Sequence, residues 1–150
     1  MKTLSRRCKY ALRALYCLSR EYERAALPAS SIATQHQIPR KFLEAILVQL
    51  RNSGIVESRH GKHGGYLLAR RPEEITLGSV IRIIDGPLAP LPCASETAYR
   101  KCDECTDPLR CETRLVMRDV RDAVARILDQ TTLDQACRRT AEASHFDYGI

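Results

Sequence analysis

The 150-residue sequence has no tryptophan, only two phenylalanines, and no apolar run of about 18 residues. We therefore expect no membrane-spanning helix, and the first residues lack the apolar stretch of a secretion signal. A core with so few large aromatic side chains must be mainly aliphatic, which suits packed helices. These absences predict a cytoplasmic protein with no membrane partner, built as one domain with a modest extension.

Acidic residues are scarce in the first half of the chain. Residues 1–71 carry 14 Lys or Arg and 4 Asp or Glu, a balance of +10, whereas residues 72–150 carry 10 and 14, a balance of −4. A basic half beside a mildly acidic half predicts a polyanion partner for the first half, although a solvated charged surface would give the same composition.

The predicted elements follow one another in the order of a winged helix-turn-helix domain. Helical periodicity and turn residues predict three helices, and two strands follow that are joined by a basic, glycine-rich tip. The second helix begins near Ser30 or Ser31, either of which is a plausible N-cap. The predicted ranges are 6–22, 30–36 and 39–53 for the helices and 55–59 and 65–69 for the strands.

The chain after the wing divides into three parts. A helix over 76–84 completes a DNA-binding domain over 1–84, and an irregular, proline-rich loop over 85–108 follows; a loop of this length is usually functional. Residues 109–141 hold a long helix and a short last helix, and 142–150 form a tail. The long helix has two apolar stripes, so it must cover its own domain and a partner chain. The fold class is mainly α (α+β), a winged helix-turn-helix domain plus a long dimerisation helix.

Candidate DNA contacts lie on the third helix, on the wing and at the start of the second helix. The third helix has a polar outer face and an apolar inner face, so it can enter a major groove. A basic wing tip is attracted to the backbone or minor groove, and a helix N-terminus can bind phosphate. A helical bundle with an unrelated hairpin would give the same order of elements. The candidates are Ser30, Ser31, Arg40, Lys41, Glu44, Arg51, Arg59, His60 and Lys62.

Four of the seven cysteines fall within the proline-rich region, at Cys93, Cys102, Cys105 and Cys111. Thiolates this close on one loop can meet at a single metal centre, and sulfur donors favour an iron–sulfur cluster or zinc. Zinc ribbons usually carry two Cys-x-x-Cys knuckles, and this loop has one. A metal-free thiol switch on Cys102 and Cys105 is a third interpretation.

The other candidate groups give weaker signals. Cys8, Cys17 and Cys137 lie on predicted helices, where small buried thiols are common core residues. His36, at the end of the second helix, is a possible further ligand. We find no phosphate loop, catalytic metal motif or nucleophile–base pair in the sequence, so we expect no enzyme activity.

Several stretches of the chain form a recognisable set: Leu4-Ser5 with Tyr10–Leu15, Arg40–Glu44, Gly64–Arg70, Pro72–Ile81 and Thr131–Leu133. Together they resemble the Rrf2 family of bacterial winged-helix transcription regulators. The family includes repressors of iron–sulfur biogenesis, of nitric-oxide responses and of cysteine metabolism. The similarity extends over about residues 2–135, and the Gly-Gly-Tyr strand with the following Glu-Ile-Thr-Leu-Gly is its most specific part.

The resemblance implies a homodimer that is joined through the long helix and binds a double-stranded DNA operator. Cluster-bearing members hold iron–sulfur, as 2Fe–2S or 4Fe–4S, with three cysteines, and Cys93, Cys105 and Cys111 fall at those places. The interval from Cys93 to Cys105 is longer than usual. Lys9 replaces the acidic fourth ligand of some relatives, so Cys102 becomes the candidate fourth ligand and His36 the second choice.

The resemblance also bears on the reading of DNA. Glu44 matches a recognition-helix residue that tunes base choice in the iron–sulfur biogenesis regulator. His60 stands where the wing of that regulator has arginine, with Arg59 one residue earlier. Tyr66, in the Gly-Gly-Tyr strand, joins the candidate DNA contacts.

The sequence thus predicts a dimeric DNA-binding repressor that senses redox, nitric-oxide or iron–sulfur status through a cysteine-ligated cluster. One alternative is a cluster-free thiol or zinc sensor on the same DNA-binding frame, since some members of the family lack a cluster. Another alternative is a non-catalytic protein-interaction module that uses the basic half.

Overall fold

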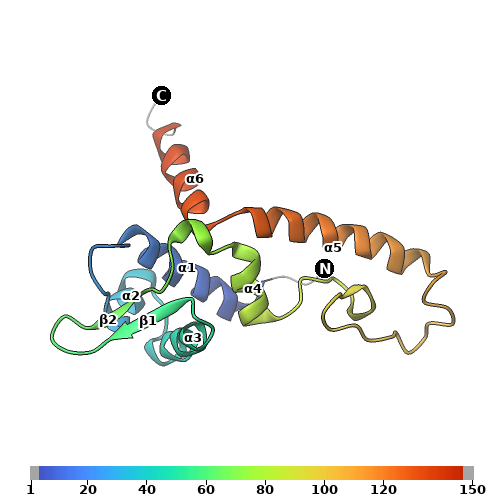
Figure 1. Ribbon diagram of the computed structural model, residues 1–150, viewed down its shortest axis with the longest axis horizontal. Helices are drawn as coiled ribbons and strands as arrows, with labels where there is room; N and C mark the ends of the chain where they lie inside the picture. Colours follow the sequence, from blue (N-terminus) through green and yellow to red (C-terminus); the bar gives the residue numbers. More distant parts are fainter. Residues whose placement is uncertain (1–3, 147–150) are drawn as a thin grey trace.

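The computed structural model describes residues 4–146, with side chains from residue 4 to residue 143. Figure 1 shows a helical domain with a small two-stranded wing, from which a long helix extends to one side. In this part of the chain, no helix is long and apolar enough to cross a membrane. The elements are α1 (Arg6–Arg20), α2 (Ala29–His36), α3 (Arg40–Asn52), β1 (Val56–Arg59), β2 (Gly65–Leu68), the 3-10 turn η1 (Pro72–Glu74), α4 (Leu77–Asp85), the 3-10 turn η2 (Pro92–Ala94), α5 (Glu112–Gln130) and α6 (Leu133–Phe146).

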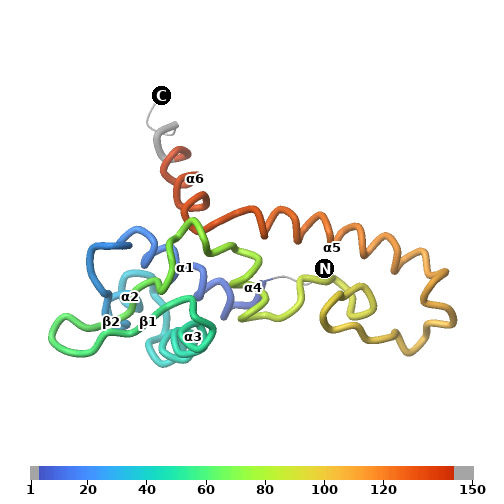
Figure 2. Tube along the Cα trace, viewed as in Figure 1, coloured from blue at the N-terminus to red at the C-terminus, as the bar shows by residue number. Residues whose placement is uncertain are grey.

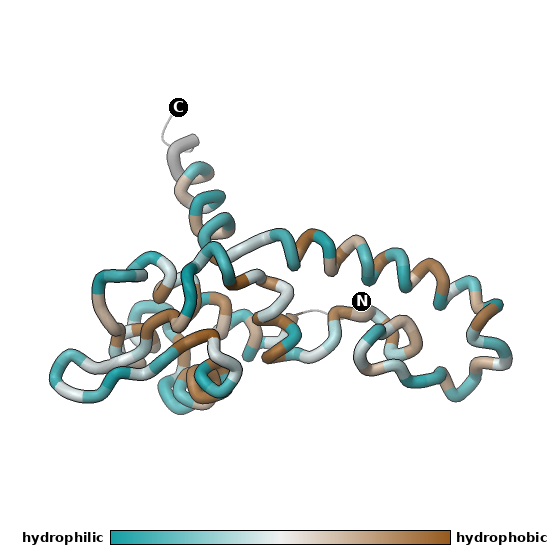
Figure 3. Tube along the Cα trace, viewed as in Figure 1, coloured by the Kyte–Doolittle hydropathy of each residue, from teal (hydrophilic) through white to brown (hydrophobic). Residues whose placement is uncertain are grey.

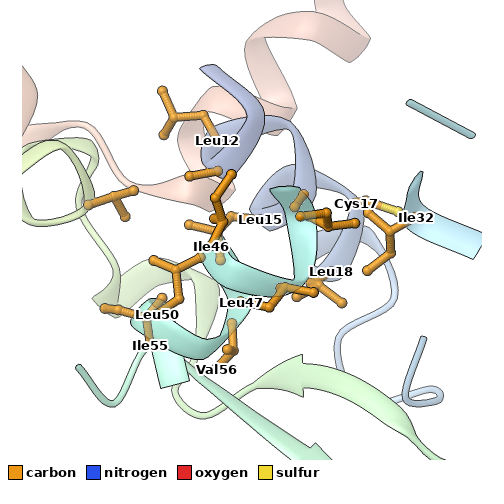
Figure 4. Close-up of a cluster of buried hydrophobic side chains, with 14 of the residues drawn as sticks. Leu12, Leu15, Cys17, Leu18, Ile32, Ile46, Leu47, Leu50, Ile55 and Val56 are labelled. Atoms are coloured by element: carbon orange, nitrogen blue, oxygen red, sulfur yellow. The ribbon is translucent and has the colours of Figure 1, made fainter. Parts of the chain in front are cut away.

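The core lies around α1 and is aliphatic, as the lack of tryptophan predicted. Ala11, Leu15 and Leu18 are buried at spacings of four and three residues, so they form one face of α1. Side chains from α2, α3 and the start of β1 pack around this face (Figure 4). The core therefore fixes α3 against α1 and leaves the outer face of α3 free for solvent or a ligand.

Local hydrogen bonds set the helix ends. Thr76 caps α4, because its Oγ1 accepts from the Ser79 amide at 3.2 Å. Thr132 and Gln135 form a reciprocal capping box at α6, with bonds of 3.0 and 3.2 Å. The predicted serine cap of α2 is wrong: the N-cap is Pro28, which has no side-chain bond. The Pro28 carbonyl accepts from the amides of Ser31 and Ile32 at 3.0 and 3.2 Å, so α2 begins at Ala29 and both serines lie inside the first turn.

Backbone contact ties the wing to the turn between α1 and α2. The two strands pair antiparallel, with Val56 opposite Leu68 and Arg59 opposite Gly65. Leu27 adds a bridge to β2, because its amide and carbonyl both bond to Tyr66 at 2.8 Å. Gly65, with a φ of +152°, permits this approach, since a Cβ there would lie 2.4 Å from the carbonyl atoms of Leu27.

The chain from α4 onward leaves the core and returns to it, as Figure 2 shows. Residues 86–111, which we call the cysteine loop, run beside α5 before the chain enters that helix. The helix begins at Glu112, three residues later than predicted, because the Asp107 carboxylate and carbonyl accept from the amides of Leu109 and Arg110 and hold a turn there. α6 continues to Phe146, past the predicted end at 141, and residues 147–150 of the predicted tail lie outside the described residues.

We expect Gly65→Ala to lower the free energy of unfolding by about 2–4 kcal/mol, because the new Cβ would collide with the Leu27 backbone. Gly61→Ala is the matched control: its φ is +103°, and a Cβ there would meet nothing within 4 Å. The control isolates backbone strain, for which we expect about 1 kcal/mol. Urea denaturation measures both changes. Equal decreases in the free energy of unfolding for Gly65→Ala and Gly61→Ala would show that the Leu27 backbone does not exclude a side chain at position 65.

Candidate functional site

The recognition helix α3 has the two faces that groove binding requires. Its inner residues Leu43, Ile46, Leu47 and Leu50 are each 0% exposed. Arg40, Lys41 and Arg51 are exposed on the remaining surface. A rigid helix with cations on its free face can enter a major groove and contact both phosphates and bases.

Arg40 and Glu44 are paired on this outer face. Arg40 Nε donates to Glu44 Oε1 at 2.9 Å across one helical turn. Because both side chains are exposed, the pair contributes little stability, about 0.5 kcal/mol or less. Its effect is on orientation, since the carboxylate holds the guanidinium in one direction near the start of α3.

Phe42 is an exposed aromatic residue that the sequence analysis missed. Its side chain is 46% exposed, and its ring meets Tyr10 edge-on at 5.9 Å between centroids. The available signal was its position outside the buried stripe that begins at Leu43. An exposed aromatic ring beside Arg40 and Lys41 can make an apolar contact, for example with a thymine methyl group.

The wing tip presents Arg59, His60 and Lys62, all exposed. Arg59 lies 3.9 Å from Glu57 on the same strand, a weak surface pair. Tyr66 differs from these residues because it is partly buried and packs against the core. The tip can therefore reach a ligand directly, whereas Tyr66 mainly positions the wing.

Ser30 and Ser31 are exposed in the first turn of α2. The amide of Ser31 already bonds to the Pro28 carbonyl at 3.0 Å, and the Ser30 carbonyl accepts from Thr34 Oγ1. Their hydroxyl groups are the parts available to a phosphate.

The cysteine loop brings its four thiols into one neighbourhood. Cys93 lies in η2 and Cys111 is the N-cap residue of α5. Cys93 and Cys102 line the same hollow of about 210 Å³, together with Arg100 and Lys101. Cys102 is exposed, whereas Cys93, Cys105 and Cys111 are half-buried.

The thiols also influence one another electrostatically. Partial burial raises the pKa of Cys105, and the nearby Cys111, Cys102 and Cys93 raise it further, while Lys101 opposes them. Among the described residues, however, no group of three or more His, Cys, Asp or Glu side chains is arranged to hold a metal ion. The donor set has the soft sulfur character that an iron–sulfur cluster needs, but the four sulfur atoms do not form a ligand shell in this structure.

His36 does not share the neighbourhood of the cysteine loop. It ends α2, which Figure 1 places on the opposite side of the winged domain. Burial lowers its pKa, and Arg20 and Arg13 on α1 lower it further. The structure therefore gives no support to His36 as a ligand to a centre in the loop of the same chain.

The remaining cysteines are separate from the loop. Cys8 and Cys17 are buried in the core. Burial, followed by the charge of Asp85, raises the pKa of Cys8 to about 11. Cys137 is half-buried, with its sulfur 3.9 Å from the Tyr16 carbonyl oxygen. These positions agree with core roles for the two α1 thiols.

α5 presents an apolar face that the described residues of its own chain do not cover. The single buried residue of this 19-residue helix is Arg121, which is polar. Val116 is 55% exposed and Ile127 is 63% exposed, whereas Met117, Val124 and Leu128 on the second predicted stripe are half-buried. Figure 3 shows apolar positions recurring along the helix. A free apolar stripe of this kind is typical of an association surface.

Arg114 and Arg121 were missed by the sequence analysis. Both side chains extend from α5 to backbone carbonyl oxygens of the cysteine loop, at Cys93 and Ala94. The available signal was their spacing of seven residues, which places two arginines on one face of the helix.

The three-helix core, the exposed α3 face and the basic wing define a winged-helix DNA-binding transcription regulator. The chain belongs to the Rrf2 family, described as an iron-dependent transcriptional regulator, whose family profile matches residues 4–139. The protein is therefore a regulator and not an enzyme.

Individual relatives agree with this assignment. The chain is 41% identical over 134 residues to the rrf2-like HTH-type transcriptional regulator of Rhodobacter capsulatus, covering 87% of this chain and 89% of the relative. The structure of CymR, the global cysteine regulator of B. subtilis, matches with a TM-score of 0.76 and 32% identity, over 93% of this chain and 98% of that one. IscR of T. potens matches with a TM-score of 0.75 and 25% identity, over 95% and 90%.

We expect alkylation at pH 8 to divide the cysteines by burial. Cys102 is exposed and should be modified by iodoacetamide within minutes, whereas Cys8 should resist. With a pKa of about 11, roughly one Cys8 in a thousand is a thiolate at this pH. Peptide mass spectrometry follows each site, and protein unfolded in urea is the control in which the two react alike. Rapid labelling of Cys8 in the folded protein would contradict its place in the core.

Proposed function

We propose that this protein is a dimeric repressor whose affinity for an operator is set by an iron–sulfur cluster on Cys93, Cys102, Cys105 and Cys111. The observation that carries the proposal is the grouping of four thiols in the loop that joins the winged domain to α5. A DNA-binding protein of this kind would act in the cytoplasm. The Rrf2 family includes members with a cluster and members without one.

The DNA-binding part of the proposal rests on the exposed cations. Arg40, Lys41 and Arg51 on α3 would contact the major groove and its phosphates, while Glu44 orients Arg40. Arg59, His60 and Lys62 would meet the backbone or the minor groove, and Ser30 and Ser31 a flanking phosphate. The balance of +10 on residues 1–71 favours a polyanion over an acidic protein surface.

The dimer follows from the uncovered stripe of α5. A second copy of the chain can bury Val116 and Ile127 against the same stripe of its own α5 by a two-fold axis. Two winged domains would then be held at a fixed separation, which two half-sites on one DNA face require.

The loop residues would have distinct tasks toward the cluster. Cys93, Cys105 and Cys111 would supply three thiolates and Cys102 the fourth. Lys101 and Arg100 line the same hollow as Cys93 and Cys102, where their positive charge would offset the negative charge of a cluster held by thiolates. When bound, the cluster would supply one-electron and nitric-oxide chemistry, and its loss would change the bonds that order the loop.

A thiol switch without metal is the second candidate, and one observation favours it. Cys102 and Cys105 share a tight turn, in which the Cys105 amide donates to the Cys102 carbonyl at 3.1 Å. A Cys-x-x-Cys pair on a turn can form and release a disulfide. CymR, one of the structural relatives, is described as a global cysteine regulator.

We expect Lys41→Ala to weaken DNA binding and to reduce the slope of log K against log salt by about 1, because one phosphate contact is lost. The probe is a duplex of about three helical turns that the wild-type protein selects from a random library, measured by fluorescence anisotropy from 50 to 300 mM salt. Arg139→Ala is the control, since Arg139 is exposed on α6, away from α3 and the wing. Unchanged affinity for Lys41→Ala and Arg40→Ala would favour the protein-interaction alternative.

We expect the protein reconstituted anaerobically with iron and sulfide to be brown and to hold both elements in stoichiometric amounts. Cys93→Ser and Cys111→Ser should lose the visible absorption, because each removes a thiolate ligand. Cys137→Ser should keep it, since Cys137 lies on α6 outside the loop. Colourless protein with one zinc per chain, or with a Cys102–Cys105 disulfide and no iron, would overturn the cluster and leave the DNA-binding proposal intact.

A further inference from the structure

We propose that Arg114 and Arg121 are positioning residues that fasten the Cys93 turn to α5 and so transmit a change in the cysteine loop to the dimerisation helix. The inference rests on the proposed function, because it assumes that the state of the loop alters DNA binding. It concerns two side chains that are neither thiol ligands nor DNA contacts.

Arg121 is the main anchor. Its side chain is only 10% exposed, which is rare for a charged group unless hydrogen bonds compensate for lost water. Nη1 donates to the Ala94 carbonyl at 2.6 Å, Nη2 lies 3.3 Å from the Glu96 carboxylate, and Nε donates to Asp122 at 2.7 Å. One buried guanidinium thus binds the loop at two residues and α5 at one.

Arg114 binds the adjacent peptide unit. Its Nε donates to the Cys93 carbonyl at 2.8 Å, and its Nη1 donates to the Pro108 carbonyl at 3.1 Å. The guanidinium also lies 5.6 Å from the centre of the Tyr99 ring, within the range of a cation–π contact. This side chain therefore joins the first part of the cysteine loop to its last part as well as to α5.

The two arginines act on consecutive residues of η2. They are seven residues apart on α5, so they share a face, and their targets are the neighbouring carbonyls of Cys93 and Ala94. A displacement of the Cys93 backbone must either stretch these bonds or move this part of α5 with it. Charge-assisted hydrogen bonds are stronger than neutral ones, so movement of the helix is the favoured response.

The other end of α5 is fastened to the winged domain. Arg82 on α4 forms two bonds with Asp129, at 2.6 and 2.9 Å, and this pairing lowers the pKa of Asp129. Gly78 leaves room for the pair, because a Cβ there would lie 2.0 Å from the Asp129 carboxylate. The first half of α5 is therefore attached to the cysteine loop, while its last turn is attached to α4.

The first measurement is amide hydrogen exchange of full-length Arg114→Met and Arg121→Met in the thiol-reduced, metal-free state. We expect exchange over residues 93–98 to rise roughly tenfold as the bonds to η2 are lost. Arg118→Met is the matched control, since Arg118 is an exposed arginine on the same helix. Arg121→Lys keeps the charge without the planar fork and should give an intermediate effect. Unchanged exchange in both methionine variants would overturn the proposal.

The second measurement is the ratio of DNA affinities between protein reconstituted with iron and sulfide and metal-free reduced protein. We expect the ratio to differ from one in wild type and to approach one in Arg114→Met, with metal-free affinity within about twofold of wild type. A wild-type ratio with Arg114→Met and Arg121→Met would overturn the transmission role alone. If wild-type protein that has bound iron has the same DNA affinity as the metal-free protein, the proposed function is overturned. The proposed role of Arg114 and Arg121 in transmitting the change is then overturned as well.

Discussion

The arrangement depends on a helix, α5, one apolar stripe of which is not buried by the described residues of its own chain. The single buried residue of α5 is an arginine that binds the cysteine loop, while Val116 and Ile127 face solvent. Burial of such side chains stabilises association by about 1.5–3 kcal/mol each, so α5 favours a second subunit. The same helix thus contacts the loop on one side and offers an association surface on another, and any change in its position affects both.

The fold class and the family could be read from sequence because their signals are local. The stripe of Leu43, Ile46, Leu47 and Leu50, the cap at Thr76 and the box at Thr132 each depend on residues within two turns of one another. The structure and the family match confirm the winged-helix assignment. The predicted N-cap of α2 was wrong because the Pro28 carbonyl accepts the first helical hydrogen bonds, from the amides of Ser31 and Ile32, so the helix has begun before either serine.

The site was only partly predictable, because its contacts join residues far apart in sequence. Arg121 meets Ala94 across 27 residues, and no pattern within either segment indicates that pair. The cysteine spacing identified the loop correctly as one neighbourhood, yet spacing cannot specify how four sulfur atoms are oriented. Those orientations depend on the loop backbone and on what it binds. The DNA contacts and thiol ligands therefore stay predictions, whereas the surfaces that carry them are defined.

The bridge between Leu27 and Tyr66 affects the spacing of the DNA contacts that one protomer would make. Because two backbone bonds join β2 at Tyr66 to the turn after α1, and α3 packs on α1, the base of the wing and the recognition helix are fastened to the same core. The distance between the base of the wing and α3 is therefore fixed within each protomer. The length of DNA between the two groove positions that they would contact is fixed as well. Any tolerance for operators of different half-site spacing must then reside in the junction of the two subunits.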